Sequence, residues 1–361
     1  MELKTKTERL DAGKPEDIAR AAEILRGGGT VAFPTETVYG LGANALSTDA
    51  VAKIFAAKQR PNWDPLIVHV CDRQMLAHVV SGELSRVAEA LVQKFWPGPL
   101  TLLLPRTDAI PDAVTAGRPL VGVRMPAHPV ALEVIRLAGV PIAAPSANRF
   151  GHTSPTTAAH VLADLDGRID AVLDGGPTAV GVESTVAEVT DDGVIVYRPG
   201  AVYPDNIESQ AGIGWVRPYK APISNVPPES LPSPGVGLRH YAPRARLILL
   251  GGVGSDALSR RKHPLELSLV SAIDAATDAV GKVGVLLPDG WDASCASAVY
   301  RWGSWNDGEE LAHRLFSGLR ELDDAGATTI ICPVPEMPGI GDAIRDRLAK
   351  AATPYLSANS P

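Results

Sequence analysis

Residues 33–45 read FPTETVYGLGANA, in which a short apolar run passes into a turn rich in threonine and glycine. A similar pairing of apolar run and polar turn recurs in KQRPNWDPLIVHV at residues 58–70 and in APSANRFGHTSPTT at residues 144–157. Each stretch predicts a strand with hydroxyl, amide or cationic groups beside its end. Such groups suit a polyphosphate and a small polar substrate, so the pattern indicates a nucleotide-using enzyme.

The first 200 residues alternate between helical and strand patterns. We expect helices over residues 15–26, from a cap at Thr48 onward and over 130–138, and strands over 30–33, 66–70, 101–104, 120–125 and 141–144. Two further strands, residues 184–189 and 194–198, flank an Asp-Asp-Gly turn and predict a hairpin. A hairpin pairs its strands antiparallel, so the sheet is expected to be mixed.

Residues 199–243 contain nine prolines and few periodic apolar positions, which predicts an extended connector. Beyond them, strands over 246–250, 283–287, 298–301 and 328–332, with helices over 265–280 and 309–322, predict a smaller α/β domain of the doubly wound type. We therefore expect a first domain at 1–200, a proline-rich linker at 201–244 and a C-terminal domain at 245–361.

Composition limits the classes of protein to consider. Lysine and arginine number 34 against 41 acidic residues, so the net charge of -7 argues against bulk binding to nucleic acid or anionic membranes. No apolar signal segment or membrane-length apolar run occurs, which favours a cytoplasmic protein with no membrane partner. The three cysteines, Cys71, Cys295 and Cys332, are scattered, so neither a disulfide framework nor a cysteine metal site is expected.

No phosphate-binding loop of the G-x-x-x-x-G-K-[ST] kind occurs, so nucleotide affinity must arise elsewhere. Lys58 and Arg60 follow a predicted helix, and Ser146 and Asn148 follow a predicted strand. Residues 154–157 predict a helix start whose free N–H groups could hold an anion. Gly252-Val253-Gly254 fits a dinucleotide fingerprint only loosely and is interpreted as a turn. No H-E-x-x-H or G-x-S-x-G motif indicates a transition metal or an acyl-enzyme serine.

The segments PTETVYGL, KxRP with PLIVH, SxN, and ESTV with RPG occur in this order and resemble the L-threonylcarbamoyladenylate synthase family, which has a YrdC-like catalytic domain. SPGVGLRHYAP at residues 233–243 and GIGDAIRDRLAKAA at 339–352 resemble the linker and C-terminal domain of its long, two-domain form. The resemblance implies a YrdC-like mixed, twisted sheet with helices, followed by a smaller doubly wound, Rossmann-like domain.

The resemblance also implies an activity. Members join L-threonine, bicarbonate and ATP into threonylcarbamoyl-AMP and pyrophosphate, with Mg²⁺ carried by the ATP. The product passes to a tRNA threonylcarbamoyl transferase complex that modifies adenosine 37 of tRNA. The synthase itself need not bind tRNA. No side-chain nucleophile and no resident metal are implied.

Site residues follow from the matched motifs. The ATP contacts implied by the resemblance are Lys58, Arg60, Ser146, Asn148, Ser154, Arg198 and, from the linker folding back over the active site, Tyr241. The implied threonine contacts are Thr35, Thr37, His69, Arg124, Ser184 and the backbone of Ala144. Asp64 occupies a further ATP-contact position, where its negative charge leaves the contact an open question.

Two other functions are weighed against this one. An RNA-binding module would need no threonine and would show salt-sensitive RNA affinity, but the acidic net charge disfavours it. A carbamoyl transferase using carbamoyl phosphate, as in hydrogenase-maturation relatives, would carry zinc fingers, for which three scattered cysteines are too few.

Overall fold

The computed structural model describes residues 6–211, 215–220, 230–233, 235–236, 240–251, 264–277, 281–293 and 295–352. The chain divides into two compact units. The first unit comprises Met1–Phe150 and Ser154–Gly237, and the second comprises Gly151–Thr153 and Leu238–Pro361. In the described parts of both units, no helix has the length and apolar character needed to cross a membrane.

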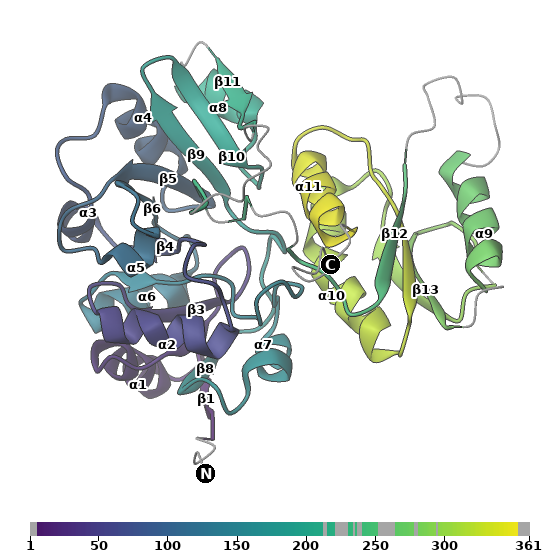
Figure 1. Ribbon diagram of the computed structural model, residues 1–361, viewed down its shortest axis with the longest axis horizontal. Helices are drawn as coiled ribbons and strands as arrows, with labels where there is room; N and C mark the ends of the chain where they lie inside the picture. The colour runs from purple at the N-terminus through teal and green to yellow at the C-terminus, as the bar shows by residue number, and fades with distance from the viewer. Residues whose placement is uncertain are drawn as a thin grey trace, which may run out of the picture. The chain divides into compact units, whose positions relative to one another are not determined.

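Eleven strands among the described residues of the first unit form one sheet in the order β1-β8-β2-β3-β7-β4-β6-β5-β9-β10-β11 (Figure 1). Their bounds are β1 Glu8–Asp11, β2 Val31–Phe33, β3 Gly40–Asn44, β4 Ile67–His69, β5 Leu100–Pro105, β6 Leu120–Arg124, β7 Ile142–Ala143, β8 Ala171–Asp174, β9 Thr185–Thr190, β10 Gly193–Arg198 and β11 Val216–Pro218. The β4–β6 pair is parallel, whereas β5–β6 and β9–β10 are antiparallel. The predictions of a mixed sheet and of the hairpin are therefore confirmed.

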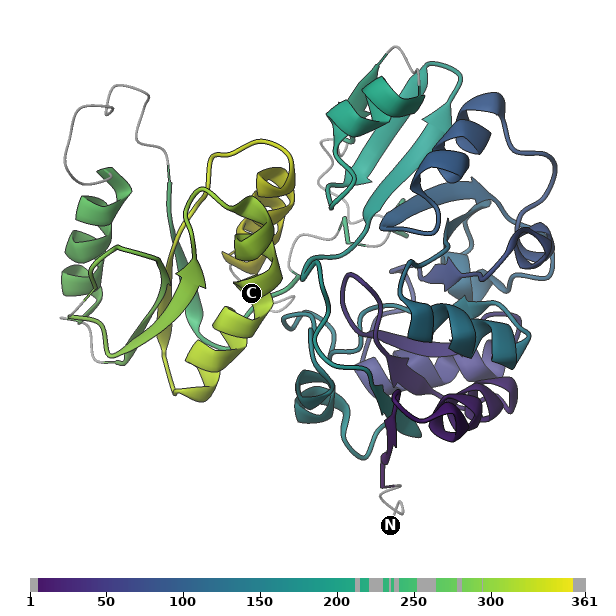
Figure 2. The ribbon, with the colours of Figure 1, turned by 180° about the vertical axis from the view of Figure 1, so that it is seen from behind.

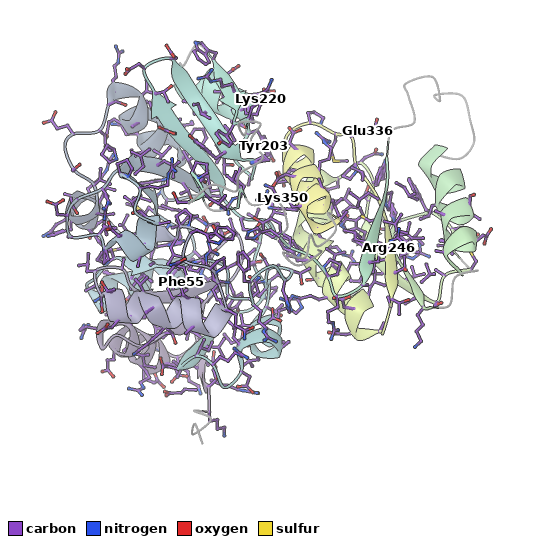
Figure 3. All side chains as sticks on the ribbon, viewed as in Figure 1. Phe55, Tyr203, Lys220, Arg246, Glu336 and Lys350 are labelled. Atoms are coloured by element: carbon purple, nitrogen blue, oxygen red, sulfur yellow. The ribbon has the colours of Figure 1, made fainter. Side chains whose placement is uncertain are left out.

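Eight helices belong to the described part of this unit: α1 Pro15–Arg26, α2 Thr48–Lys58, α3 Arg73–Val79, α4 Arg86–Phe95, α5 Asp112–Thr115, α6 Pro129–Ala138, α7 Ala158–Leu165 and α8 Pro204–Ala211. Successive residues of β2 point to opposite faces of the sheet. Val31 and Phe33 belong to a core with residues of α1 and α6, whereas Ala32 belongs to a core with residues of α2. Helices thus cover both faces (Figure 2), and Phe55 packs from α2 onto the second core (Figure 3).

Close packing explains a glycine in the stretch that follows β2. A Cβ at Gly42 would lie 2.6 Å from a ring carbon of Phe33 and 2.8 Å from a methyl carbon of Ile142. Strands β2 and β7 flank β3 on either side, so a larger residue would push them apart. The glycine therefore lets side chains of both flanking strands pack against β3.

Residues 204–218 differ from the expectation of an extended connector. They contain α8, with Ile207 buried in the core, and β11, which pairs parallel with β10. Pro204 opens the helix and Pro218 closes the strand, positions that proline tolerates because no backbone N–H is required there. The prediction failed because it counted prolines without considering where they fall.

Two helix starts also differ from the expected ones. The cap of α2 is Ser47 rather than Thr48, since the Ser47 hydroxyl accepts the Ala50 N–H at 3.2 Å. Helix α7 begins at Ala158 with Thr157 as its cap, so residues 154–156 form no helical turn. Ser154 is therefore free to use its hydroxyl elsewhere.

The second unit contains a parallel sheet of four strands among its described residues, in the order β12-β15-β13-β14. The strands are β12 Arg246–Leu250, β13 Val283–Pro288, β14 Ala298–Gly303 and β15 Thr329–Pro333, and the helices are α9 Pro264–Thr277, α10 Gly308–Asp324 and α11 Ile340–Ala352 (Figure 1). This arrangement confirms the expected smaller α/β layer fold. The Gly252-Val253-Gly254 turn and residues 278–280 of the expected helix lie outside the described residues.

Candidate functional site

Lys58, the last residue of α2, is fully buried. Its Nζ lies 2.5 Å from the carbonyl oxygens of both Ser146 and Asn148, in the segment after β7. Burial lowers the pKa of Lys58 well below its ordinary value, and the nearby charge of Arg60 lowers it further. Three of the residues expected at a phosphate site are therefore in direct contact.

Arg60 is held by the turn that follows α2. Its guanidinium donates to the carbonyls of Asp64 and Pro65 at 3.1 and 2.7 Å, and its Nη2 lies 2.9 Å from a carboxylate oxygen of Asp64. The Asp64 carboxyl is completely buried, and burial raises its pKa against the attraction of Arg60, Lys58 and Arg198. The negative charge of Asp64 left its role open in the sequence analysis. In the structure, Asp64 pairs with Arg60, a cation that was expected to bind phosphate.

Two residues near the start of β9 connect further predicted positions. Glu183 accepts a hydrogen bond from the Ser154 hydroxyl, and both side chains are buried. Arg198, at the end of β10, donates to the backbone oxygen and the hydroxyl of Ser184, each at 3.0 Å. We call Lys58, Arg60 and Arg198, together with the carboxylates Asp64, Asp164 and Glu183, the cationic cluster, because each member interacts electrostatically with another.

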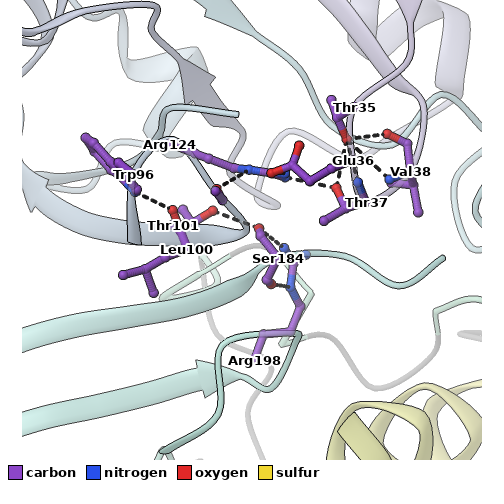
Figure 4. Close-up of polar contacts among 11 residues, drawn as sticks. Thr35, Glu36, Thr37, Val38, Trp96, Leu100, Thr101, Arg124, Ser184 and Arg198 are labelled. Carbon is purple, nitrogen blue, oxygen red and sulfur yellow. Dashed lines mark hydrogen bonds and ion pairs between the residues drawn. The ribbon is translucent and has the colours of Figure 1, made fainter. Parts of the chain in front are cut away.

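The loop between β2 and β3 presents two buried hydroxyls. The Oγ1 atoms of Thr35 and Thr37 are 2.8 Å apart, and Thr35 also donates to the Val38 carbonyl at 2.7 Å (Figure 4). The backbone oxygens of Glu36 and Thr37 accept from Val180 and Gly181 at 2.8 and 3.1 Å. These contacts fix the loop, so its side chains are held in place before any ligand arrives.

Arg124 ends β6, and its guanidinium points toward this loop (Figure 4). Nη1 donates to Thr37 Oγ1 at 3.0 Å, Nε donates to the Gly98 carbonyl at 3.2 Å, and Nη2 lies 2.6 Å from Glu36 Oε1. Burial would raise the pKa of Glu36, but Arg124 and backbone groups at Ala127 and Glu36 lower it more, and the net shift is downward. The Glu36–Arg124 pair is therefore an ionised pair inside the protein.

His69 faces the same site from the neighbouring strand, because β4 and β6 run parallel with His69 opposite Arg124. Burial and the charge of Arg124 lower the pKa of His69 to about 3, against an opposing effect of Glu36. The imidazole is consequently neutral at physiological pH, and its Nδ1 has no hydrogen-bond partner among the described residues. A neutral acceptor beside an ion pair is well suited to a polar substrate.

Ser184 joins the two groups of residues. Its hydroxyl is 2.8 Å from Thr101 Oγ1 on β5 and accepts from Arg198, so one side chain contacts both a cationic residue and the sheet that carries Arg124 (Figure 4). Ala144, whose N–H bonds the Ile67 carbonyl at 2.8 Å, lies between β7 and Ser146 in the chain. Contacts in the first unit thus link several of the expected site residues: Lys58 with Ser146 and Asn148, Arg124 with Thr37, and Arg198 with Ser184.

Tyr241 belongs to the second unit. Its φ is 65°, its ring stacks on Phe316 at 5.7 Å, and the Arg347 guanidinium lies 5.1 Å from the ring centroid. A non-glycine residue at positive φ is held against its preference by surrounding contacts. The structure therefore shows how this tyrosine is anchored, and its contact with ATP stays a prediction.

Sequence reasoning missed Glu36 and gave Glu183 no specific role. A signal was present for Glu36, because a carboxylate between two hydroxyl residues in a mainly apolar stretch must find a buried partner. That partner, Arg124, lies 88 residues further along the chain, and only folding reveals it. Among the described residues, no group of three or more histidine, cysteine or acidic side chains could hold a metal ion.

Comparisons with known proteins agree with this geometry. A family profile described as "Telomere recombination" matches residues 23–200, and one described as "Threonylcarbamoyl-AMP synthase, C-terminal domain" matches residues 206–353. Proteins named threonylcarbamoyl-AMP synthase from Pyrococcus abyssi and Bacillus subtilis are 42% and 44% identical to this chain. Each alignment covers 96% of this chain, with 96% of the Pyrococcus protein and 95% of the Bacillus protein.

A solved structure is similar over nearly the same length. The crystal structure of P. abyssi Sua5 complexed with L-threonine aligns with a TM-score of 0.86 at 39% identity. The alignment covers 96% of this chain and 97% of the crystallised chain. The similarity therefore extends over both units of the present protein and is not confined to one of them.

Proposed function

The chain belongs to the threonylcarbamoyl-AMP synthase family, and we propose that it joins L-threonine, bicarbonate and ATP into threonylcarbamoyl-AMP with release of pyrophosphate. The observation that carries the proposal is that Ser184 contacts Arg198 of the cationic cluster and also Thr101 of β5, the strand that pairs with β6, at whose end Arg124 meets Glu36. Polyphosphate and amino acid would then lie next to each other. The reaction needs that proximity, since the threonine amine is carboxylated by bicarbonate with loss of water, and the resulting carbamate oxygen then bonds to the α-phosphorus as pyrophosphate leaves.

The residues have distinct proposed roles. Lys58, Arg60, Ser146, Asn148, Ser154 and Arg198 would bind ATP, and Thr35, Thr37, His69, Arg124, Ser184 and the Ala144 backbone would bind threonine. When the carbamate attacks the α-phosphorus, negative charge grows on phosphate oxygens, and preformed cations stabilise it. An arriving polyphosphate would also favour the charged form of Lys58. No enzyme nucleophile is needed.

Mg²⁺ would enter with ATP. Two carboxylates of the cationic cluster are engaged, Asp64 with Arg60 and Glu183 with Ser154, which fits an ion held by phosphate oxygens rather than by protein. The bound ion would reduce the negative charge of the triphosphate. The adenylate would then pass to a tRNA threonylcarbamoyl transferase complex.

Of the expected linker at residues 201–244, the part that follows Lys220, with Tyr241, is proposed to cover the nucleotide and exclude water from a labile mixed anhydride. Because α8 and β11 complete the first sheet, a truncation that tests this role must begin after Lys220 rather than after Gly200. The expected result is a shorter lifetime of the adenylate. An unchanged lifetime and yield would exclude the covering role.

The test of the activity is incubation of the purified protein with ATP, Mg²⁺, labelled bicarbonate and single amino acids. We expect a labelled acyl-adenylate and pyrophosphate with threonine, and neither product when threonine or bicarbonate is omitted. Pyrophosphate release that is independent of both would contradict the proposal. RNA binding without any adenylate would favour the RNA-binding alternative instead.

A further inference from the structure

Glu36 is not among the residues proposed to contact ATP or threonine, yet it lies beside Arg124, which is. It lies between Thr35 and Thr37 in the chain, and its carboxylate sits beside the Arg124 guanidinium (Figure 4). Only 13% of its side chain is exposed. Its backbone oxygen accepts the Val180 N–H at 2.8 Å, which fixes the loop on which it sits. A carboxylate placed this rigidly in the interior requires a physical reason.

Stability alone is a weak reason. A buried ion pair often stabilises a fold no better than apolar residues of the same size, because removing two charges from water offsets their attraction. Thr37 and the Gly98 carbonyl already orient the Arg124 guanidinium from two other sides. Glu36 is therefore not needed merely to hold Arg124 in place, and a role toward a ligand is favoured.

The charge balance of these residues indicates the ligand. Arg124 and Glu36 contribute one positive and one negative charge, and the neighbouring His69 is neutral. A site that bound only a carboxylate would be better served without Glu36. A balanced pair is instead complementary to a zwitterion, whose carboxylate and ammonium group need opposite partners at short separation.

Glu36 also has acceptor capacity to spare. An ionised carboxylate can accept about four hydrogen bonds through its two oxygens. Arg124 approaches Oε1 alone, and the remaining influence on the group comes from the backbone at Ala127 and at Glu36 itself. Binding an ammonium group would therefore not require Glu36 to abandon Arg124.

We propose that Glu36 binds the α-ammonium group of the amino-acid substrate while Arg124 binds its carboxylate. The inference rests on the proposed function, since it assigns a protein partner to the amine of threonine in the proposed threonine site. Glu36 is thus a substrate-binding residue. It selects amino acids over carboxylic acids that lack the amine.

Calorimetric titration with two ligands tests this assignment. L-threonine carries the amine, whereas 3-hydroxybutanoate has the same carboxylate and hydroxyl without it. Wild-type protein should bind threonine at least about tenfold more tightly than the analogue, since one charge-assisted hydrogen bond is lost. The variant Glu36→Gln should weaken threonine binding by about 10- to 100-fold and change analogue binding by less than about threefold.

The control variant is Glu188→Gln, which removes a carboxylate of β9 that accepts from the Tyr197 hydroxyl in the same unit. It should leave both affinities unchanged. Equal weakening of both ligands by Glu36→Gln would overturn the proposal, because Glu36 would then act only through Arg124. Unchanged threonine binding in that variant would overturn it as well.

Failure of the proposed function is distinguishable from failure of this inference. If wild-type protein binds no threonine, the threonine-dependent function fails and the inference fails with it. If wild-type protein binds threonine and the analogue equally well, only the inference fails. The wild-type comparison can overturn the inference even if Glu36→Gln does not fold. In that case Glu36→Asp, which keeps the charge on a side chain one methylene shorter, tests the residue itself and should weaken threonine binding more than analogue binding.

Discussion

The cationic cluster and the Glu36–Arg124 pair differ in the number of cations that they gather. The cluster has three cationic side chains among three carboxylates, whereas the pair has one of each beside a neutral histidine. Several cations from different elements suit a polyanion, and a single pair suits a zwitterion. In both places the cations are engaged before a ligand arrives, so binding exchanges partners and does not fill unused donors.

Removing Arg60 should have the largest effect on stability of the changes considered. It acts on the cationic cluster and leaves the Glu36–Arg124 pair in place. Arg60→Ala would leave the Asp64 carboxylate buried without its ion-pair partner, which costs about 3–5 kcal/mol in such cases. Denaturant titration of Arg60→Ala and of Arg60→Ala/Asp64→Asn measures the loss, and the double variant should recover part of it.

Arg73→Ala is the matched control, because it breaks the more exposed Arg73–Glu89 pair on the surface of the same unit. It should change the free energy of unfolding much less. Comparable losses of unfolding free energy in the two arginine variants would show that the Arg60–Asp64 pair contributes no more to stability than an exposed ion pair.

Lys58→Ala should abolish most of the chemistry. Loss of one preformed charge-stabilising donor typically lowers kcat by about 10²–10³-fold. Pyrophosphate release in the presence of threonine and bicarbonate measures it. Lys53→Ala is the control, since Lys53 also lies on α2 and donates to a carbonyl, that of Gly28, but at the surface. Full activity of Lys58→Ala would exclude Lys58 from the phosphate site.

The ratio of kcat/KM for threonine to that for serine should be modest. It should depend only on the residues that are proposed to bind the amino acid. One methyl group in an apolar contact contributes about 1–3 kcal/mol to the ratio of kcat/KM values. Adenylate formation with the two amino acids measures this ratio. Substitutions at Lys58 should lower both rates without altering the ratio, and a changed ratio would mean that the two regions are not separable.

The buried His69 should make the free energy of unfolding depend on pH. Its folded pKa of about 3 lies below the ordinary value of 6.5, so the unfolded chain binds a proton between these values and the folded chain does not. Stability is therefore lost as pH falls from about 6.5 toward 3, by at most about 1.4 kcal/mol per pH unit from this group.

His69→Asn should flatten the dependence of unfolding free energy on pH across that window, measured by denaturant titration at several pH values. The same change at exposed His78 should leave the slope as it is in the wild type. An unchanged slope in His69→Asn would mean that the imidazole is not held neutral inside the fold.

Local patterns predicted much of this protein. The β9–β10 hairpin follows from alternating apolar residues around Asp-Asp-Gly, and β12 was expected at the residues where it lies, because period and turn chemistry are local properties. The error at residues 204–218 has a tertiary cause, since Ile207 and β11 are stabilised by burial and by pairing with β10.

The sequence by itself determined the alternation of helices and strands, the motifs and the candidate site residues, because these depend on residue type and spacing along the chain. Tertiary structure decided which charges meet. Asp64 could have faced solvent, but it pairs with Arg60, and Glu36 meets an arginine from β6. Arg60 and Asp64 are only four residues apart, and what the fold decided is that this pair is buried. The Glu36–Arg124 pairing depends on which segments the sheet brings together, because no local pattern encodes the distance between residues 88 positions apart.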